Sequence, residues 1–365
     1  MYNKNFIPIM SLLLAGSLYS CNKEKIVIND VPQSTDTITV VERYAEALWQ
    51  PIDRNTLPSD AAGFNPLGFC ISGDTLYISN WTARTIEVYD AKNMTYSHTI
   101  YANESGRTLN SRDVCVSDTL LFVASGNPSQ VSVYNRFTEE YLCRLGDGST
   151  SGSVQQANCV AVDSNFVYVR DQSELLKLFD RREINEAIAK KQKNVSPKYK
   201  YSIPGSVSIS QDYDMQAVDG YLLAANNMDK TLYVYSCEAD TSLYEVKSLK
   251  YTDNTIPYGI AASEKYIFIS TEGASAGIHA YNRKSFFELD NLDEPEYTLN
   301  YTEVVGLDNA LEFVHFMDFS NDSTLFVRQN GKIQPLLLRE RHYHIITPVL
   351  VPGNTDSDKN KNEQN

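Results

Sequence analysis

Short apolar stretches with polar residues at alternate positions recur along the chain between residues 37 and 352. In each recurrence, a short segment is followed by a turn, a stronger alternating segment, a polar loop and a third segment. The first copy reads GFCIS, GDTLYISNW and TIEVYDA, and the fifth reads GIAAS, EKYIFISTE and GIHAYNR. Alternation with a period of two, with Gly or Asp at the breaks, predicts β-strands joined by tight turns.

Six copies of this pattern are present. The equivalent residue of the first segment is, in order, Ile71, Val116, Val162, Val218, Ala262 and Phe319. Four-stranded propeller blades need about 40–50 residues, so this spacing fits six blades with an insertion after the third and the fifth. We therefore predict an all-β fold, a six-bladed β-propeller. A β-sandwich of similar strands is the alternative, but six near-copies favour radial repetition.

Most copies end their third segment with an aromatic residue followed by a short polar one. These pairs are Tyr89-Asp90, Tyr134-Asn135, Phe179-Asp180, Tyr235-Ser236 and Tyr281-Asn282. We expect each aromatic ring to pack between neighbouring blades and each polar residue to begin a turn.

The ring must also close. Thr37–Tyr44 is rich in β-branched residues, and we expect it to pair into the last blade beside strands at Lys332–Leu338 and His344–Val351. Pro335 in the sixth copy suggests an exposed or bulged strand position, since proline lacks the N–H that a strand ladder uses.

The two insertions differ in pattern. Arg182–Asn194 places Ile184, Ala187 and Ile188 at helical spacing, which predicts a short surface helix on the face opposite the usual binding rim. Glu294–Phe313 contains several aromatic and aliphatic residues and is expected to drape over blade five or six.

The amino terminus has the pattern of an export signal. Lys4 precedes an apolar segment, Ile7–Leu18, which is too short to span a bilayer comfortably. The ending Leu18-Tyr19-Ser20-Cys21 resembles the bacterial lipobox, in which the Cys is lipidated and the peptide is cut before it. The resemblance implies an outer-membrane lipoprotein of the cell envelope, with the membrane face left open. An ordinary secretory signal with a chance Cys is the alternative.

These segments set the expected domain organisation. Residues 1–21 form the signal peptide, 22–36 a flexible tether, 37–352 the propeller and 353–365 a polar, disordered tail.

Composition narrows the function classes. A formal net charge of −14 and the lack of a basic patch disfavour nucleic-acid binding. Apart from Cys21, five cysteines remain, with no CxxC pair, so a full disulfide framework is not expected. Cys70, Cys115 and Cys159 sit inside apolar strand segments, where a thiol behaves as a small buried hydrophobe.

The repeat, with an aromatic and a polar residue at the end of most third strands, resembles the TolB-like and NHL-like six-bladed propellers, especially the lipoprotein group common in Bacteroidetes. The similarity covers roughly Thr37 to Pro352 and rests on the blade rhythm and the aromatic–polar strand endings. It implies a ligand-binding or protein-binding scaffold at the envelope, and it carries over no individual functional residue.

The rim of a propeller channel is built where first strands begin and second strands end. The candidates at the first-strand side are Asn65, Arg112, Asp113, Asn158, Asp212, Asp214, Tyr258 and His315. The candidates at the second-strand side are Asn80, Trp81, Arg170, Asp171, Asn226, Asn227, Glu272 and Arg328. Carboxylates, amides, Arg forks and stacking rings in this mixture suit a polar ligand.

The main hypothesis is a binding scaffold for a protein, peptide or glycan partner at the envelope, with no catalytic residue and no cofactor. The second is a lactonase-like or lyase-like enzyme whose divalent metal would be held by Asp113, Asn158, Asp212 and Glu272. The third is a structural subunit of an envelope complex.

Overall fold

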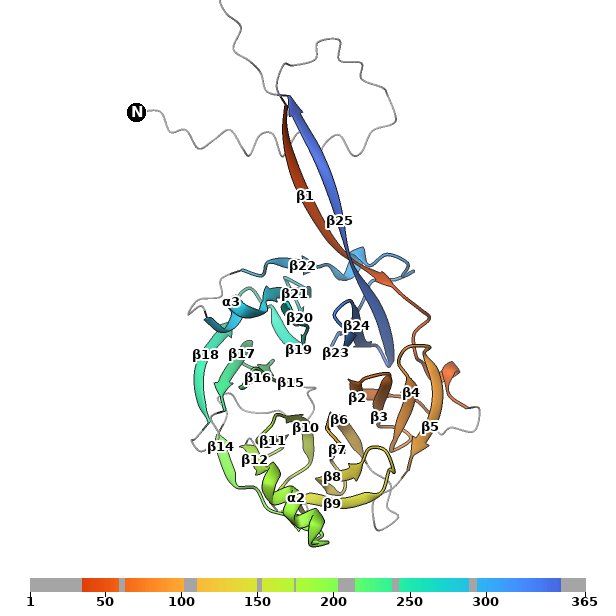
Figure 1. Cartoon of the computed structure of the whole chain (residues 1–365), viewed down its shortest axis with the longest axis vertical. Helices are drawn as coiled ribbons and strands as arrows, with labels where there is room; N and C mark the ends of the chain where they lie inside the picture. The colour runs from red at the N-terminus through yellow and green to blue at the C-terminus, as the bar shows by residue number, and fades with distance from the viewer. Residues whose placement is uncertain are drawn as a thin grey trace, which may run out of the picture. The chain divides into compact units, whose positions relative to one another are not determined.

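The computed structural model describes residues 35–58, 63–101, 110–149, 153–173, 175–202, 214–237, 243–288 and 294–348. The chain divides into two compact units. The larger, Glu42–Arg341, is a ring of six β-sheets and confirms the predicted six-bladed propeller (Figure 1). The smaller contains residues 1–41 and 342–365, of which residues 35–41 and 342–348 are described as strand.

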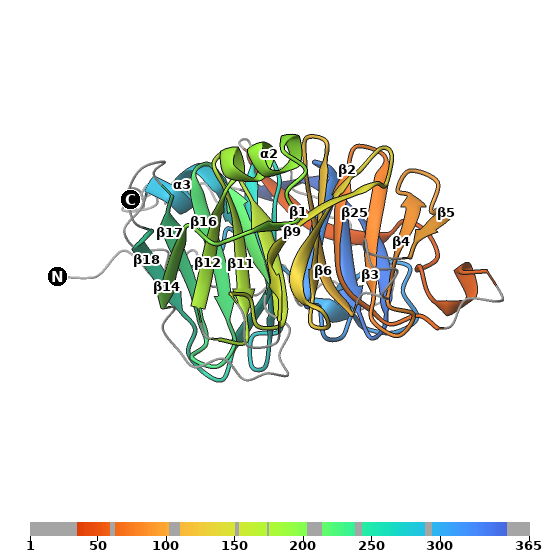
Figure 2. The ribbon, with the colours of Figure 1, turned by 90° about the horizontal axis from the view of Figure 1, so that it is seen from below.

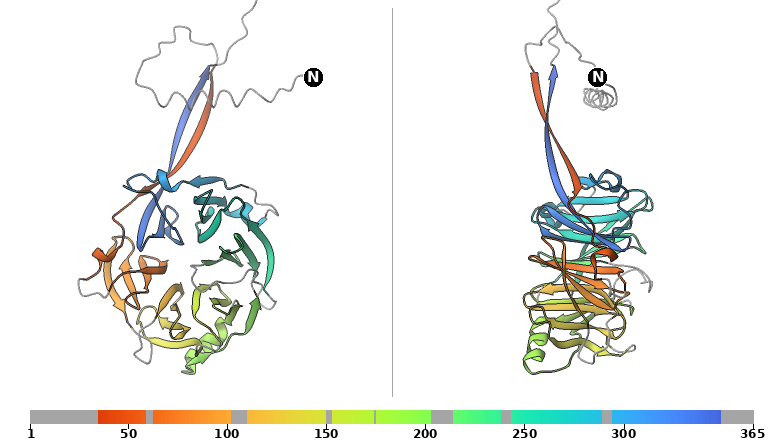
Figure 3. Two further views of the ribbon diagram at one scale, coloured as in Figure 1. Left: turned by 180° about the vertical axis from the view of Figure 1, so that it is seen from behind. Right: turned by 90° about the vertical axis from the view of Figure 1, so that its right-hand side faces the viewer.

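Each blade is an antiparallel sheet whose four main strands follow one another from the channel outwards, and Figure 3 shows the ring from behind. Blade 1 contains β2 (Pro66–Ser72), β3 (Thr75–Asn80), β4 (Thr85–Asp90) and β5 (Thr95–Ile100). Blade 2 contains β6 (Ser111–Ser117), β7 (Leu120–Ser125), β8 (Ser129–Asn135) and β9 (Tyr141–Gly148). Blade 3 contains β10 (Ala157–Val162), β11 (Phe166–Asp171), β12 (Leu175–Asp180) and β14 (Tyr199–Ser202).

The second half of the ring repeats this arrangement. Blade 4 contains β15 (Met215–Val218), β16 (Tyr221–Asn226), β17 (Thr231–Ser236) and β18 (Tyr244–Lys250). Blade 5 contains β19 (Ile256–Ala262), β20 (Tyr266–Glu272), β21 (Gly277–Asn282) and β22 (Tyr297–Leu299). Blade 6 contains β23 (Phe316–Asn321), β24 (Thr324–Gln329), β25 (Lys332–Pro348) and, from the other end of the chain, β1 (Thr35–Ala47).

The order β1–β25–β24–β23 in blade 6 confirms that an N-terminal strand closes the ring. Three details of the structure differ from the prediction. The strands expected at Lys332–Leu338 and His344–Val351 are parts of one strand as far as Pro348. Pro335 is buried inside that strand and pairs with Phe326, and its carbonyl accepts a hydrogen bond from the backbone N–H of Leu48 at 3.2 Å. β1 also begins at Thr35, inside the segment predicted as tether.

The core consists of six apolar clusters, one at each blade boundary. The predicted position of the third-strand aromatics is confirmed: Tyr134 of blade 2 packs with Ile86 and Val88 of blade 1. Phe179 of blade 3 packs in the same way with Phe122 of blade 2. Each ring therefore stabilises the boundary with the preceding blade.

Arginine side chains add polar links across the same boundaries. Arg181, which follows the Phe179-Asp180 pair, donates to Asp118 of blade 2 at 2.6 Å. Arg283 follows Tyr281-Asn282 and binds both carboxylate oxygens of Asp219 in blade 4 at 2.7 Å. Such bidentate pairs fix geometry as well as adding energy.

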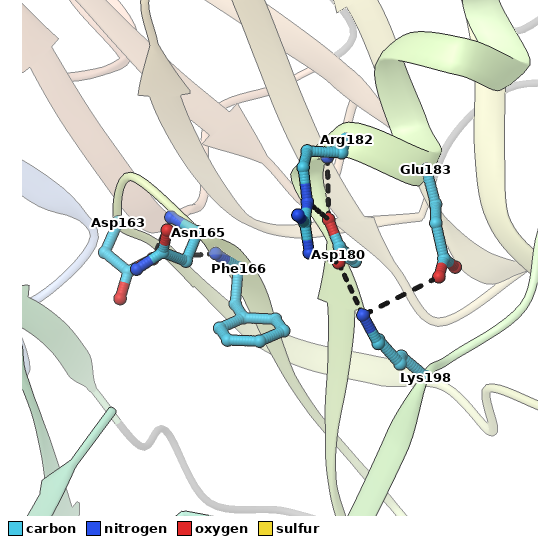
Figure 4. Close-up of polar contacts among 7 residues, drawn as sticks. All are labelled: Asp163, Asn165, Phe166, Asp180, Arg182, Glu183 and Lys198. Atoms are coloured by element: carbon cyan, nitrogen blue, oxygen red, sulfur yellow. Dashed lines mark hydrogen bonds and ion pairs between the residues drawn. The ribbon is translucent and has the colours of Figure 1, made fainter. Parts of the chain in front are cut away.

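The predicted surface helix is present as α2 (Arg181–Ala189), shorter than expected, with Ile184 and Ala187 buried. Figure 4 shows its first turn, where Asp180 accepts from the backbone N–H of Arg182 at 2.8 Å and from Lys198 at 2.7 Å. Burial alone would raise the pKa of Asp180, but the hydrogen bonds from Arg182 and Lys198 hold it below its usual value. The helix therefore begins at a paired carboxylate that also offsets its N-terminal dipole.

The remaining insertion residues extend the blades. After α2, β13 (Asn194–Val195) pairs in parallel with β9 and gives blade 2 a fifth strand. The second insertion supplies β22, the outer strand of blade 5, and the short helix η3 (Tyr301–Glu303). A further helix, α3 (Arg283–Glu288), follows β21. Figure 2 shows α2 and α3 at the same face of the ring, as expected because both follow third strands.

A cavity-forming substitution at a blade boundary tests this core. We expect Phe179→Ala to lower the free energy of unfolding by about 3–5 kcal/mol, because the ring is fully buried and its packed surroundings relax only in part. Phe137→Ala is the matched control, since that ring is 69% exposed and should change stability by less than about 0.5 kcal/mol. Urea denaturation of both variants measures the difference. Equal midpoints would contradict the packing role of Phe179.

Candidate functional site

The channel entrance is shaped by an irregularity that recurs at the start of the inner strand. In blades 2 and 3 the pairing register shifts between Ser111 and Asp113 and between Ala157 and Cys159. Blades 1 and 5 show a similar shift. An extra residue in one strand re-aims side chains locally. Arg112 and Asn158 are the extra residues of blades 2 and 3, and Tyr258 lies within the shift of blade 5.

Three predicted residues from blades 1, 2 and 3 meet at this rim. Arg112 Nη1 donates to Asn158 Oδ1 at 2.6 Å, and its guanidinium lies 5.0 Å from the ring centroid of Trp81. Trp81 directly follows β3, and Asn158 lies at the start of β10. A cation above an indole face is electrostatically favourable, so the arginine is held both by the ring and by the amide.

A second group joins blades 5, 6 and 1. The rings of Tyr258 and His315 stack at 4.3 Å with an angle of 10° between their planes. His315 Nε2 lies 3.2 Å from Glu272 Oε1, and Arg328 Nη1 lies 2.8 Å from His315 Nδ1. A guanidinium can only donate, so Nδ1 accepts and Nε2–H donates to Glu272. Arg328 Nε also donates to the carbonyl of Pro66 at 3.0 Å.

Other predicted rim residues have partners inside the blades. Asp171 forms a buried ion pair with Lys177, and Arg170 donates to the carbonyl of Ala225 in blade 4 at 3.2 Å. The side chain of Asn226 accepts from the backbone N–H of Met228 at 3.1 Å. The backbone N–H of Asn65 donates to the side chain of Asn80 at 3.1 Å. The polar side chains at these positions therefore stabilise the strand ends and the contacts between blades.

Asp113 belongs to the channel wall. Its Oδ1 accepts from the backbone N–H of Val114 at 2.8 Å, and its Oδ2 accepts from Val160 of blade 3 at 2.9 Å. A Cβ on Gly68 would lie 2.2 Å from Asp113 Oδ1, so only glycine permits this approach.

Two more acids repeat this link at alternate blades. Asp214 of blade 4 accepts from Ile260 of blade 5 at 2.7 Å, and Asp318 of blade 6 accepts from Ile71 of blade 1 at 2.7 Å. All three line a cavity of about 160 Å³ between the inner strands. Burial raises the pKa of Asp113 to about 7 and that of Asp318 to about 6. Burial also raises the pKa of Asp214, and repulsion from the other two carboxylates adds to it.

The described cysteines are unpaired thiols. Cys143, Cys159 and Cys237 are buried, and Cys70 and Cys115 are half-buried beside the channel cavity. Burial raises the pKa of the Cys115 and Cys159 thiols. They therefore act as small apolar residues, as predicted.

Several predictions fall outside the described residues or concern metal binding. Cys21 and Asp212 lie in undescribed segments. Among the described residues, no group of three or more His, Cys, Asp or Glu side chains is placed to hold a metal ion. No helix in the described part of the chain has the length and apolar character needed to cross a membrane.

Two rim residues were not predicted from the sequence. Phe313 meets His315 edge-on at 6.1 Å, and Gln172 directly follows β11. The sequence repeat could have indicated Gln172, because Gln172 directly follows the second strand of blade 3, as Trp81 directly follows the second strand of blade 1. Phe313 lies within an insertion, where no repeat marks its place.

Comparison with known proteins supports the fold alone. No family model and no curated protein matches the chain. A crystal structure of a structural-genomics protein of unknown function from Bacteroides thetaiotaomicron is similar, with a TM-score of 0.55 and 11% identity, covering 83% of this chain and 77% of that one. The computationally designed Ika8 protein gives a TM-score of 0.43 and 14% identity, covering 74% of this chain and 70% of the other.

The raised pKa values of the channel acids predict how the free energy of unfolding depends on pH. Because the pKa of Asp113 is about 7 in the folded state against a usual 3.8, its contribution to stability is complete below pH 3.8 and is lost as the pH rises to about 7. We expect the free energy of unfolding to fall as the pH rises from about 5 to about 7, and to fall less in Asp113→Asn. Urea denaturation across this range measures both slopes.

The control for this experiment is Asp118→Asn. The Arg181 guanidinium lowers the pKa of Asp118, so this carboxylate is already ionised at the acidic end of that range. The variant should keep the pH slope of the unmodified protein. If Asp113→Asn also keeps that slope, the buried acid does not cause the pH dependence.

Proposed function

We propose that this protein is a binding scaffold of the cell envelope that captures a polar partner at its channel rim. The observation that carries the proposal is the pair of rim groups, one around Arg112 and one around His315. Each combines an aromatic ring with a charged side chain, and each is assembled from three blades. Rings and arginines held in place are the groups that contribute most to recognition surfaces.

The geometry favours binding over catalysis. Arg112 is fixed by Asn158, and His315 is fixed by Tyr258, Glu272 and Arg328. Side chains that are already ordered lose little conformational entropy when a partner binds, which favours affinity. Both nitrogens of His315 are engaged with charged neighbours, which holds its ring in place against Tyr258.

The proposal includes attachment to the membrane through Cys21. The segment before it resembles a lipobox, and two or three acyl chains would anchor the protein essentially permanently, at about 0.8 kcal/mol for each buried methylene. Residues 22–34, between Cys21 and the start of β1, would then separate the lipid from the first strand.

A single substitution tests the anchor. In the native bacterium, Cys21→Ser should move the protein from the membrane fraction to the soluble fraction and abolish incorporation of labelled palmitate. The unmodified chain and a conservative Ser20→Ala variant serve as controls, since a small residue before the Cys satisfies the lipobox. Membrane retention of the Cys21→Ser protein would contradict the anchor.

The rim itself is tested by a double substitution. Trp81→Ala with Tyr258→Ala removes one ring from each rim group, and we expect capture of partners from a solubilised envelope extract to fall at least about tenfold. Phe137→Ala with Tyr244→Ala is the control, because these rings are exposed away from the rim. Unchanged capture by the rim variant, with an unchanged melting temperature, would count against the proposed function.

A further inference from the structure

The rim over blades 3 and 4 carries three amide side chains. Asn158 lies at the start of β10, Gln172 directly follows β11, and Asn227 directly follows β16. Each has one buried atom without a hydrogen-bond partner among the described residues: Asn158 Nδ2, Gln172 Nε2 and Asn227 Oδ1. Such atoms are uncommon in folded proteins, because desolvation without a partner costs free energy.

The orientation of one amide is fixed by its neighbour. Asn158 Oδ1 accepts from the guanidinium of Arg112, so its Nδ2 is a donor. Asn158 and Asn227 are each only 7% exposed. The rim therefore carries polar atoms in fixed positions, and one of these amides, Asn158, binds the arginine that lies over the ring of Trp81.

The chemistry of these atoms selects the ligand. Gln172 Nε2 and Asn158 Nδ2 require acceptors, while Asn227 Oδ1 requires a donor. An anion offers acceptors only, and it would also approach the channel carboxylates Asp113 and Asp214. An ammonium or guanidinium group offers donors only, and a metal ion offers no acceptor, so either would leave the two amide N–H groups unsatisfied. A hydroxyl group both donates and accepts, so an uncharged polyhydroxyl compound satisfies all three positions.

We infer that this rim binds an uncharged carbohydrate, with its hydroxyl groups on the three amides and a sugar face near Trp81. Amide side chains beside an aromatic ring form a site of the kind that small polar ligands use. The inference rests on the proposed function, since it names the ligand class of the same rim. A peptide backbone also offers donors and acceptors, and binding of a peptide instead is an outcome of the test.

The chain offers an internal probe, because it contains only two tryptophans, Trp49 and Trp81. In the full chain carrying Trp49→Phe, Trp81 is the only indole, and its fluorescence reports on the rim. The probes are maltohexaose, xylohexaose and chitohexaose, with hexagalacturonate as the anionic comparison and a capped Gly-Ala hexapeptide as the peptide comparison. We expect at least one neutral sugar to change the emission and to bind more tightly than either comparison.

Substitution of the amides tests the contact itself. Asn158→Leu and Asn227→Leu should each weaken the binding of that sugar about tenfold, the effect expected for one lost hydrogen bond. Asn165→Leu is the matched control, because Asn165 lies in the β10–β11 turn, at the other end of these strands from Asn158 and Gln172. Figure 4 shows Asn165 beside Phe166 in this turn. If either variant lowers the melting temperature, Gln172→Leu, at a half-buried position, replaces it.

Each outcome decides between the two proposals. Loss of sugar binding in the amide variants but not in Asn165→Leu supports the carbohydrate site. No response to any neutral sugar, stronger binding of the peptide or of hexagalacturonate, or equal sugar binding by all variants overturns it. If the carbohydrate site is overturned while the Trp81 and Tyr258 double variant still loses partner capture, the proposed function stands without it.

Discussion

Every blade of this protein is apolar on both faces, and this constraint governs the rest of the structure. A four-stranded sheet of this kind cannot bury itself, so each face must pack against the next blade. The six apolar clusters each take residues from two neighbouring blades, and the last boundary forms only when blade 6 meets blade 1. Strand β1 completes blade 6 from the opposite end of the chain, so the ring is closed by hydrogen bonds between an N-terminal and a C-terminal strand.

Polar side chains form specific links across the boundaries between blades. The channel acids at blades 2, 4 and 6 each bind the backbone of the following blade, while Arg181 and Arg283 bind the inner turn of the preceding blade. Apolar packing is not directional, whereas each of these hydrogen bonds joins one donor to one acceptor. Hydrogen bonds to single backbone groups fix the angle between neighbours, and this rigidity holds the rim residues of different blades in place.

The architecture could be predicted from the sequence because blade period, alternation and the aromatic–polar endings are all local. The ring closure could be predicted because Thr37–Tyr44 had no other sheet to join. The pairing of Arg112 with Trp81 and Asn158 could not, since it joins three blades and depends on a register shift that no residue type marks. The position of Pro335 was predicted wrongly for a related reason. We expected an exposed or bulged strand position, but Pro335 is buried, and its burial depends on β1, a strand from the opposite end of the chain.

The shift at the start of β6 also explains why neighbouring residues have different roles. Arg112 and Asp113 are adjacent, and both were predicted as ligand contacts. Because the shift changes the direction of one side chain, Arg112 reaches the rim while Asp113 binds blade 3 inside the channel.

A substitution at Asp113 would disturb the ring and the rim together, because its carboxylate joins two blades. The amides of Gln172 and Asn227 carry unpaired atoms within the described part of the chain, so their loss would leave the blade boundaries intact. The rim can therefore vary in sequence at such positions while the blades keep their packing, which the proposed role in recognition would require.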